Sequence, residues 1–296
     1  MSTLTVHPLA GNIGAELHGI DLTAPLARDE IAGIRAALVE WKVVFFRDQH
    51  VSQAQHIAFG AQFGDVTPAH PTLPARFPEH PEILSLDNQS GGLEQGPTIE
   101  SRWHTDVTFV PNPPMGSILR GVTVPPYGGD TQWSNLALAY SRLSGEIRTF
   151  LDGLHAVHHN TLPIARGEME SGYQSQFQSE YISSVHPVVR VHPESGERVL
   201  FVNPTFTSHI VELSRKESGH VLAMLYEQIA DPALTVRFRW EPDSIAFWDN
   251  RATAHLVPTD TPPGHQRHMQ RITIAGDLPV GVDGEESRAL TGSAFR

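Results

Sequence analysis

The chain has 296 residues, of which 40% are hydrophobic and 18% charged, and its formal net charge is -12. Only 21 residues are Lys or Arg, which argues against an extended phosphate-binding face and so against a nucleic-acid partner. The chain has no cysteine, which excludes disulfides, zinc fingers, iron–sulfur sites and thiol nucleophiles. The strong metal ligands that remain are carboxylates and 17 histidines.

The first residues, 1–7, carry neither a basic segment nor an apolar signal segment, and no apolar run approaches the ~20 residues of a membrane span. We therefore expect a cytoplasmic protein with no membrane partner. Residues 4–22 alternate in short extended segments separated by glycines. Apolar residues from Leu26 to Trp41 recur at helical spacing, which predicts an amphipathic helix packed on a sheet.

The next stretch predicts a strand, a second helix and a long surface loop. The apolar run 43–46 is typical of a strand buried on both faces, and Ser52 is typical of the N-cap of a helix that ends at Gly64. Five prolines between residues 65 and 81 exclude regular helix there. After a strand at 83–86, the glycine-rich residues 88–101 are a candidate lid.

The middle of the chain alternates strands with a broken helix. Residues 103–109 and 117–124 are predicted strands, and helical patterning follows from 136 to 154 with a break near Ser144. The polar stretch 158–184 is long for a compact domain, and we interpret it as an insertion.

The C-terminal third is strand-rich. A hairpin is predicted between 187–191 and 198–202, and Ser214 with Glu217 forms the capping box of a helix. The last predicted strands are 235–240, 244–248 and 270–275.

This order of elements bears on the fold class. Strands dominate from residue 83 onward, and helices are inserted instead of alternating with strands, which argues against a doubly wound sheet. A β-sandwich or jelly roll with helical insertions fits best, so we predict an α+β fold with a double-stranded β-helix (jelly-roll) core. We expect residues 1–296 to form one domain.

Polar residues lie two apart in the predicted strand 103–109. On a strand, His104 and Asp106 point to the same face because successive side chains alternate. An imidazole and a carboxylate side by side can chelate a divalent transition metal, and a second histidine completes a facial triad. A polar turn after the apolar strand at 244–248 delivers His255 as that ligand. The alternative is a polar cluster packed inside a β-sandwich.

Two arginines that follow His255 in the chain could bind anions. On a strand through residues 267–271, Arg267 and Arg271 are four apart and share a face. Guanidinium groups suit the bidentate binding of planar carboxylates and related oxyanions. The alternative for Arg267 is a structural ion pair.

Several motifs, in this order and spacing, resemble one known group of enzymes. They are Trp103–Phe109, Tyr127–Thr131, His186–Arg190, Trp248–Arg251 and His255 with Arg267. The chain resembles, from about residue 4 to 279, the iron(II)- and 2-oxoglutarate-dependent dioxygenases of the taurine dioxygenase (TauD/TfdA) family.

The resemblance implies a catalytic Fe(II) bound by His104, Asp106 and His255, with positions left for the co-substrates 2-oxoglutarate and O2. It also implies that Arg267, helped by the Thr131 hydroxyl, pairs with the distal carboxylate of 2-oxoglutarate. Relatives of this kind commonly form dimers or tetramers, so a homo-oligomer is expected.

The substrate-binding residues implied by the resemblance are His70, Leu73, Glu100, Val107 and Arg271. Arg271 matches the position that binds the substrate anion, and His70 matches a substrate-contacting histidine. Leu73 and Glu100 replace a tyrosine and an asparagine that contact the substrate in taurine dioxygenase. These replacements count against taurine itself.

The implied reaction is hydroxylation of a small organosulfur anion at the carbon next to sulfur, with release of succinate and CO2. For taurine or another alkanesulfonate the products are an aldehyde and sulfite. Residues 201–203 look like taurine dioxygenase, whereas residues 280–284 look more like the alkylsulfatase branch. The alternatives are therefore an alkyl sulfate ester dioxygenase, a phenoxyalkanoate dioxygenase, and a non-catalytic jelly roll that binds metal and oxoacid.

Overall fold

The structure, a computed structural model, describes residues 4–89, 102–161, 177 and 180–296. Most of the predicted lid and most of the predicted insertion lie outside the described residues.

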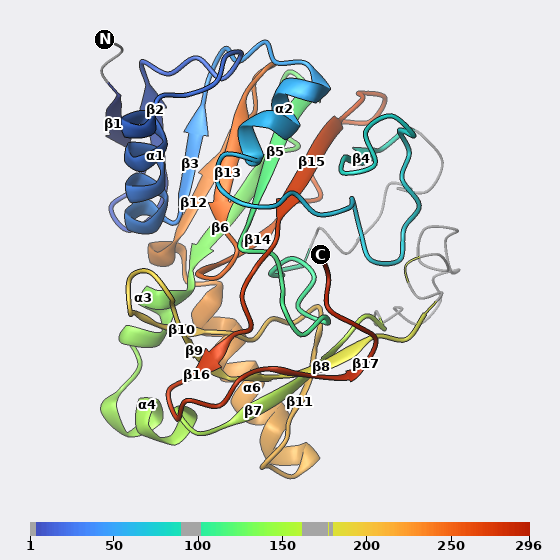
Figure 1. Cartoon of the computed structure of the whole chain (residues 1–296). Helices are drawn as coiled ribbons and strands as arrows, with labels where there is room; N and C mark the ends of the chain where they lie inside the picture. The colour runs from blue at the N-terminus through green and yellow to red at the C-terminus, as the bar shows by residue number, and fades with distance from the viewer. Residues whose placement is uncertain (1–3, 90–101, 162–176, 178–179) are drawn as a thin grey trace.

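A seven-stranded sheet forms the upper half of the molecule in Figure 1. Neighbouring strands pair antiparallel, except that β2 and β3 are parallel. In spatial order the strands are β1 (Thr5–Pro8), β2 (Ala15–His18), β3 (Val43–Phe46), β13 (Ile245–Asp249), β5 (Gly116–Thr123), β15 (His268–Ile274) and β4 (Leu84–Asp87).

A smaller sheet of β12 (Thr235–Phe238), β6 (Thr131–Asn135) and β14 (Thr253–Leu256) packs on one face of the seven-stranded sheet. Aromatic side chains fill the space between the two sheets. Phe45 stacks on Phe238 at 4.0 Å between ring centroids, and Trp133 lies 5.6 Å from Trp248. Two facing antiparallel sheets with helices outside them confirm the predicted jelly-roll core.

The helices α1 (Arg28–Trp41) and α2 (Gln53–Gly60) cover the other face of the large sheet. Strand β13 shows why both faces are apolar: Ala246 and Trp248 face the small sheet, whereas Ile245 and Phe247 face the helices. The Ser52 side chain accepts a hydrogen bond from the Gln55 N–H, as predicted for an N-cap. The helix ends at Gly60 and not at Gly64, because turns follow it.

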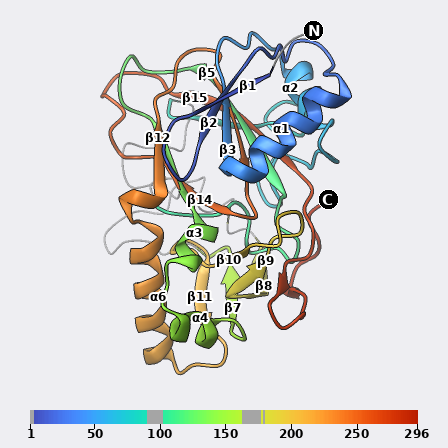
Figure 2. The ribbon, with the colours of Figure 1, turned by 90° about the vertical axis from the view of Figure 1, so that its left-hand side faces the viewer.

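The lower half of the molecule holds the remaining strands and α6, the longest helix among the described residues. Figure 2 shows α6 from the side, along its whole length. One sheet contains β11 (Thr207–Ile210), β7 (His155–His159), β8 (Ser183–Pro187) and β17 (Arg288–Thr291). The other contains β10 (Arg198–Leu200), β9 (Val189–Val191) and β16 (Val280–Gly281). The helices are α3 (Leu136–Ser141), α4 (Gly145–Leu151), α6 (Arg215–Ile229) and the short 3-10 helix η2 (Pro232–Leu234).

These elements confirm some predictions and correct one. The hairpin pairs Val191 with Arg198, and the capping box opens α6. The polar stretch 158–184 is not an insertion throughout, because its ends belong to β7 and β8, which pair with each other. The sequence did not indicate β7 because three of its five residues are histidines, and one of its inward-facing residues is the buried His158. Among the described residues no helix is long and apolar enough to cross a membrane.

The buried histidine of α2 makes stability depend on pH. His56 is fully buried, and its Nε2 hydrogen-bonds the Ile118 carbonyl. Burial lowers the pKa of His56 to about 4. As pH falls from 6.5 towards 4, His56 is therefore protonated in the unfolded chain but stays neutral in the folded chain, and stability decreases.

We expect His56→Gln to remove this contribution, about 3 kcal/mol of the stability lost between pH 6.5 and 4. The measurement is the free energy of unfolding in urea across that range. The exposed His220 supplies the control, since His220→Gln should leave the pH dependence unchanged. Equal slopes for wild type and His56→Gln would contradict the assignment.

Candidate active site

The segment carrying the first two predicted ligands is not a strand. His104 forms an isolated antiparallel bridge with His255, and residues 106–109 then form a turn. Val107, in that turn, has a positive φ of 57°, which no strand permits. His104 and Asp106 therefore converge through a bridge followed by a turn, and not through the alternation of a strand as predicted.

The third ligand lies on β14, inside a strand and not at the end of a polar turn. Its main-chain N–H donates to the His104 carbonyl at 2.7 Å, and the His104 N–H donates back to the His255 carbonyl at 2.9 Å. This pairing places the two imidazole rings 4.1 Å apart between centroids.

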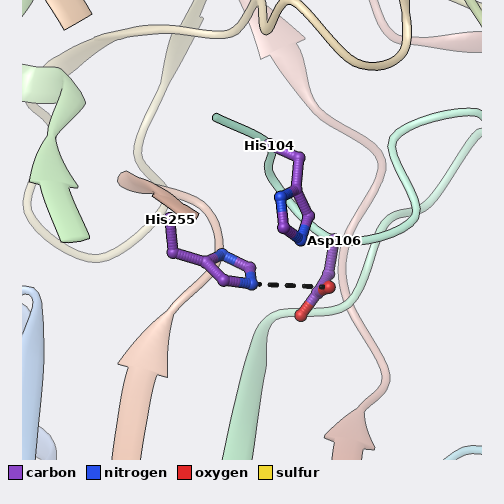
Figure 3. A group of neighbouring side chains, drawn as sticks. All are labelled: His104, Asp106 and His255. Atoms are coloured by element: carbon purple, nitrogen blue, oxygen red, sulfur yellow. Dashed lines mark ion pairs between the residues drawn. The ribbon is translucent and has the colours of Figure 1, made fainter. Parts of the chain in front are cut away.

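The two imidazoles and the Asp106 carboxylate point toward one another in Figure 3. His255 Nε2 lies 3.9 Å from Asp106 Oδ1, and one ligand atom from each of the three residues lies within 4.8 Å of the others. All three side chains are buried. A second group in the described residues, His155, Asp283 and Glu285, has two exposed carboxylates, so the buried group is the better metal site.

The protonation of the three side chains suits a metal. His104 Nδ1 donates to the Arg102 carbonyl at 2.8 Å, which leaves Nε2 with its lone pair. Burial keeps the pKa of His255 well below its usual range, so this imidazole is neutral. Burial alone would raise the pKa of Asp106, but the charge of Arg271, followed by the two histidines, lowers it to about 2.

Both oxygens of the Asp106 carboxylate accept hydrogen bonds. The Ser117 hydroxyl, on β5, donates to Oδ2 at 2.7 Å, and the Arg271 guanidinium pairs with Oδ1. Arg271 Nε is buried without a hydrogen-bond partner among the described residues. A buried unpaired N–H is costly, which points to a ligand at this place.

Arg267 lies just before β15 and contacts another part of the interior. Its Nε donates to the Gly129 carbonyl at 2.8 Å, and a terminal nitrogen donates to Thr131 Oγ1 at 3.3 Å. The Trp240 indole also donates to Thr131 Oγ1, at 2.9 Å. Because this oxygen accepts two hydrogen bonds, the Thr131 hydroxyl hydrogen can be donated to a ligand.

An apolar cluster stands beside the triad. It contains Leu73 and Val107 together with four phenylalanines. One of them, Phe206, lies 6.4 Å from the His104 ring, measured between centroids. The other three are Phe109, Phe177 and Phe295.

His70 packs against this apolar cluster, 4.8 Å from the Phe177 ring. Its Nδ1 accepts hydrogen bonds from the Thr72 and Leu73 N–H groups at 3.1 and 3.2 Å. The ring proton therefore lies on Nε2. Burial, followed by the charge of Arg271, lowers the pKa of His70 to about 3, so the ring is neutral. Glu100, also predicted to contact the substrate, lies outside the described residues.

The donor set fits one class of metal site. Two imidazoles and one carboxylate, converging from one side, are the facial triad of non-haem iron(II) oxygenases. In the absence of cysteine, no thiolate competes for a softer metal.

Comparison with known proteins agrees with this geometry. The sequence pattern of the family "Taurine catabolism dioxygenase TauD, TfdA family" matches residues 5–273. The chain belongs to the TauD/TfdA family. It is 42% identical to an alpha-ketoglutarate-dependent sulfate ester dioxygenase of Pseudomonas putida, over 96% of this chain and 94% of that protein.

Two further relatives cover nearly the whole chain. An alkylsulfatase of Acinetobacter baylyi is 36% identical over 95% of this chain and 88% of its own length. The crystal structure of a taurine dioxygenase from Burkholderia xenovorans is 49% identical, with a TM-score of 0.85 over 98% of this chain and 95% of that one.

This TauD/TfdA protein is thus an Fe(II)- and 2-oxoglutarate-dependent dioxygenase that acts on a small organic substrate, with His104, Asp106 and His255 as its facial triad. Fe(II) held by these three residues would supply the activation of O2. The prediction of an oxidoreductase with these cofactors is confirmed.

Sequence reasoning missed two residues that touch the site. Ser117 orients the Asp106 carboxylate, and Trp240 donates to Thr131. Ser117 stands in a predicted strand, but no motif singles it out. Trp240 lies at the end of a predicted strand, where core packing is the commoner role for an aromatic.

We expect His255→Ala to weaken the binding of Mn(II), used as a redox-stable probe, by at least about 100-fold, because one of three ligands is lost. Electron paramagnetic resonance of free Mn(II) measures the affinity. His220→Ala, at an exposed histidine, is the control and should bind Mn(II) as wild type does. Unchanged binding by His255→Ala would mean that the metal lies elsewhere.

Proposed function

We propose that this enzyme oxidises an organosulfur anion with an apolar chain at the carbon next to the sulfur-bearing group, and that an alkyl sulfate ester is the best candidate substrate. The observation that carries the proposal is the buried Arg271 guanidinium, which pairs with the metal ligand Asp106 and whose Nε has no hydrogen-bond partner among the described residues. Its neighbour on β4, Leu84, belongs to the apolar cluster.

We assign 2-oxoglutarate to the side of the site where Arg267 and Thr131 meet. The Arg267 guanidinium, already ordered by the Gly129 carbonyl, offers charge-assisted hydrogen bonds to the distal carboxylate. The Thr131 hydroxyl adds a neutral donor at the same place.

We assign the anionic head of the substrate to Arg271 and His70. Arg271 Nε offers an N–H that is already desolvated, so binding an anion adds a hydrogen bond without further loss of water. His70 offers an uncharged Nε2–H, since its Nδ1 accepts from the main chain. A neutral donor beside a cation suits an oxyanion with several oxygens.

The apolar cluster supports an aliphatic chain. Leu73 and Val107 are at most 9% exposed, and the aromatic rings of Phe177 and Phe206 stack beside them. Burying an ammonium group against such side chains is costly, whereas burying methylenes is favourable. The relatives named for sulfate ester and alkylsulfatase chemistry support the same choice.

The reaction balances as follows. One oxygen atom of O2 enters succinate as 2-oxoglutarate loses CO2, and the other replaces a C–H bond of the substrate with C–OH. The product of an alkyl sulfate is a hemiacetal-like sulfate ester, in which the C–O bond to sulfate breaks while the hydroxyl oxygen forms the aldehyde C=O. The leaving group is sulfate, and the hydroxyl proton goes to solvent.

A second candidate substrate is an alkanesulfonate, for which the same hydroxylation breaks the C–S bond and releases sulfite. The similarity to a solved taurine dioxygenase favours it. Taurine itself is the weaker case, because Leu73 offers no hydrogen bond to a substrate.

An anaerobically reconstituted enzyme, loaded with Fe(II) and 2-oxoglutarate and then given O2, tests the substrate. We expect succinate and aldehyde with linear alkyl sulfates, accompanied by sulfate, at kcat/KM values at least tenfold above those for taurine. Sulfite from alkanesulfonates would favour the second candidate. A phenol from phenoxyalkanoates, or oxoglutarate binding without O2 consumption, would contradict the proposal.

Replacing each of the two arginines should weaken the binding of a different ligand. We expect Arg267→Ala to weaken 2-oxoglutarate binding about 10- to 100-fold, because charged hydrogen bonds are lost. Arg271→Ala should raise the KM for the alkyl sulfate by a similar factor and change 2-oxoglutarate binding by less than about threefold. Calorimetry with Mn(II)-loaded protein measures the first effect and steady-state kinetics the second. Reversed effects would overturn the assignment of the two cations.

A further inference from the structure

Asn250 occupies the turn between β13 and β14 and is fully buried. Its side-chain amide makes three hydrogen bonds. Oδ1 accepts from the Asp106 N–H at 2.9 Å, and Nδ2 donates to the Asp106 carbonyl at 3.1 Å and to the Pro114 carbonyl at 3.1 Å. The amide thus hydrogen-bonds both the main-chain N–H and the main-chain carbonyl of a metal ligand.

The three ligands are held in different ways. His104 and His255 are fixed by their mutual main-chain bridge. Asp106 lies two residues beyond the bridged His104, in a turn, where no ladder continues. The Asn250 amide takes the place of a strand neighbour there, because it presents an acceptor and a donor to the N–H and C=O of one residue.

The third hydrogen bond ties this turn to the sheet. Pro114 precedes Met115 and β5, and the main-chain N–H of Asn250 donates to the Met115 carbonyl at 3.0 Å. Asn250 therefore connects the metal-ligand turn with the start of the strand that carries Ser117. Ser117 in turn holds the Asp106 carboxylate.

The turn needs these hydrogen bonds because its backbone is strained. Val107 is β-branched and has a φ of 57°, a region that costs such a residue about 1–3 kcal/mol. A strained residue persists only where its surroundings fix it. The Asp106 carbonyl that Asn250 binds belongs to the peptide group directly before Val107.

We propose that Asn250 is a positioning residue for the metal: its amide fixes the backbone of Asp106, so that the single carboxylate of the triad is set before the metal arrives. Preorganised ligands do not lose further conformational freedom on binding, and partners one step beyond the ligands contribute about 10- to 100-fold to metal affinity. Asn250 itself does not touch the metal.

Asn160 supplies a closely matched control. It is also buried, at 1% exposure, and its amide likewise accepts one N–H, from Ile182, and donates to two carbonyls, those of Phe177 and Glu180. Truncating either asparagine removes the same three kinds of hydrogen bond, but only Asn250 binds Asp106. The pair separates positioning of the metal ligand from a general loss of stability.

The test is the Mn(II) affinity of the full chain, measured by electron paramagnetic resonance well below the melting temperature of each variant. We expect Asn250→Ala to weaken Mn(II) binding about 10- to 100-fold and Asn160→Ala to change it by less than about threefold, although both lower the melting temperature. Asn250→Ser, whose hydroxyl can restore one hydrogen bond, should fall between wild type and Asn250→Ala.

Wild-type Mn(II) affinity in Asn250→Ala, or an equal loss in Asn160→Ala, would overturn the proposal. If Asn250→Ala does not fold, Asn250→Ser and Asn160→Ser carry the same comparison with the same criteria.

Discussion

The antiparallel bridge between His104 and His255 is the contact on which the site depends. Two short hydrogen bonds join residues 151 positions apart in the chain and set their imidazoles side by side. The bridge ends after one residue pair, the chain turns at Asp106, and a carboxylate oxygen lies within 4.8 Å of a nitrogen of each imidazole. A longer strand would keep Asp106 on a ladder and leave less freedom for this approach.

Charge is balanced around the same carboxylate. A buried anion is costly unless it is paired, and Asp106 is paired with Arg271 and hydrogen-bonded to Ser117. Arg271 is buried as well: a terminal guanidinium nitrogen pairs with the metal ligand, and Nε has no hydrogen-bond partner among the described residues. In the proposed assignment, the metal site and the anion site share this one cation, so their electrostatics are interdependent.

The motif Trp248–Arg251 shows how one short segment serves several layers of structure. Trp248 packs between the two sheets, and Asp249 is a fully buried partner of Arg251 and His192. Asn250 holds the metal-ligand turn. The motif was recognisable in the sequence as a family mark, but the separate tasks of its residues became visible only when their partners from distant segments were in place.

The amino-acid sequence by itself indicated the reaction class, because its metal-ligand motifs resemble, in identity, order and spacing, those of the TauD/TfdA family. It also determined most elements, since the apolar run of β13 and the capping residues Ser52 and Ser214 are local features of the sequence. Tertiary structure decided how His104 and Asp106 converge, because a left-handed Val107 has no local signature and is held by residues far along the chain. It also decided that Arg271 pairs with Asp106 while its β4 neighbour Leu84 joins an apolar cluster, since such neighbours come from several strands and no single stretch encodes them.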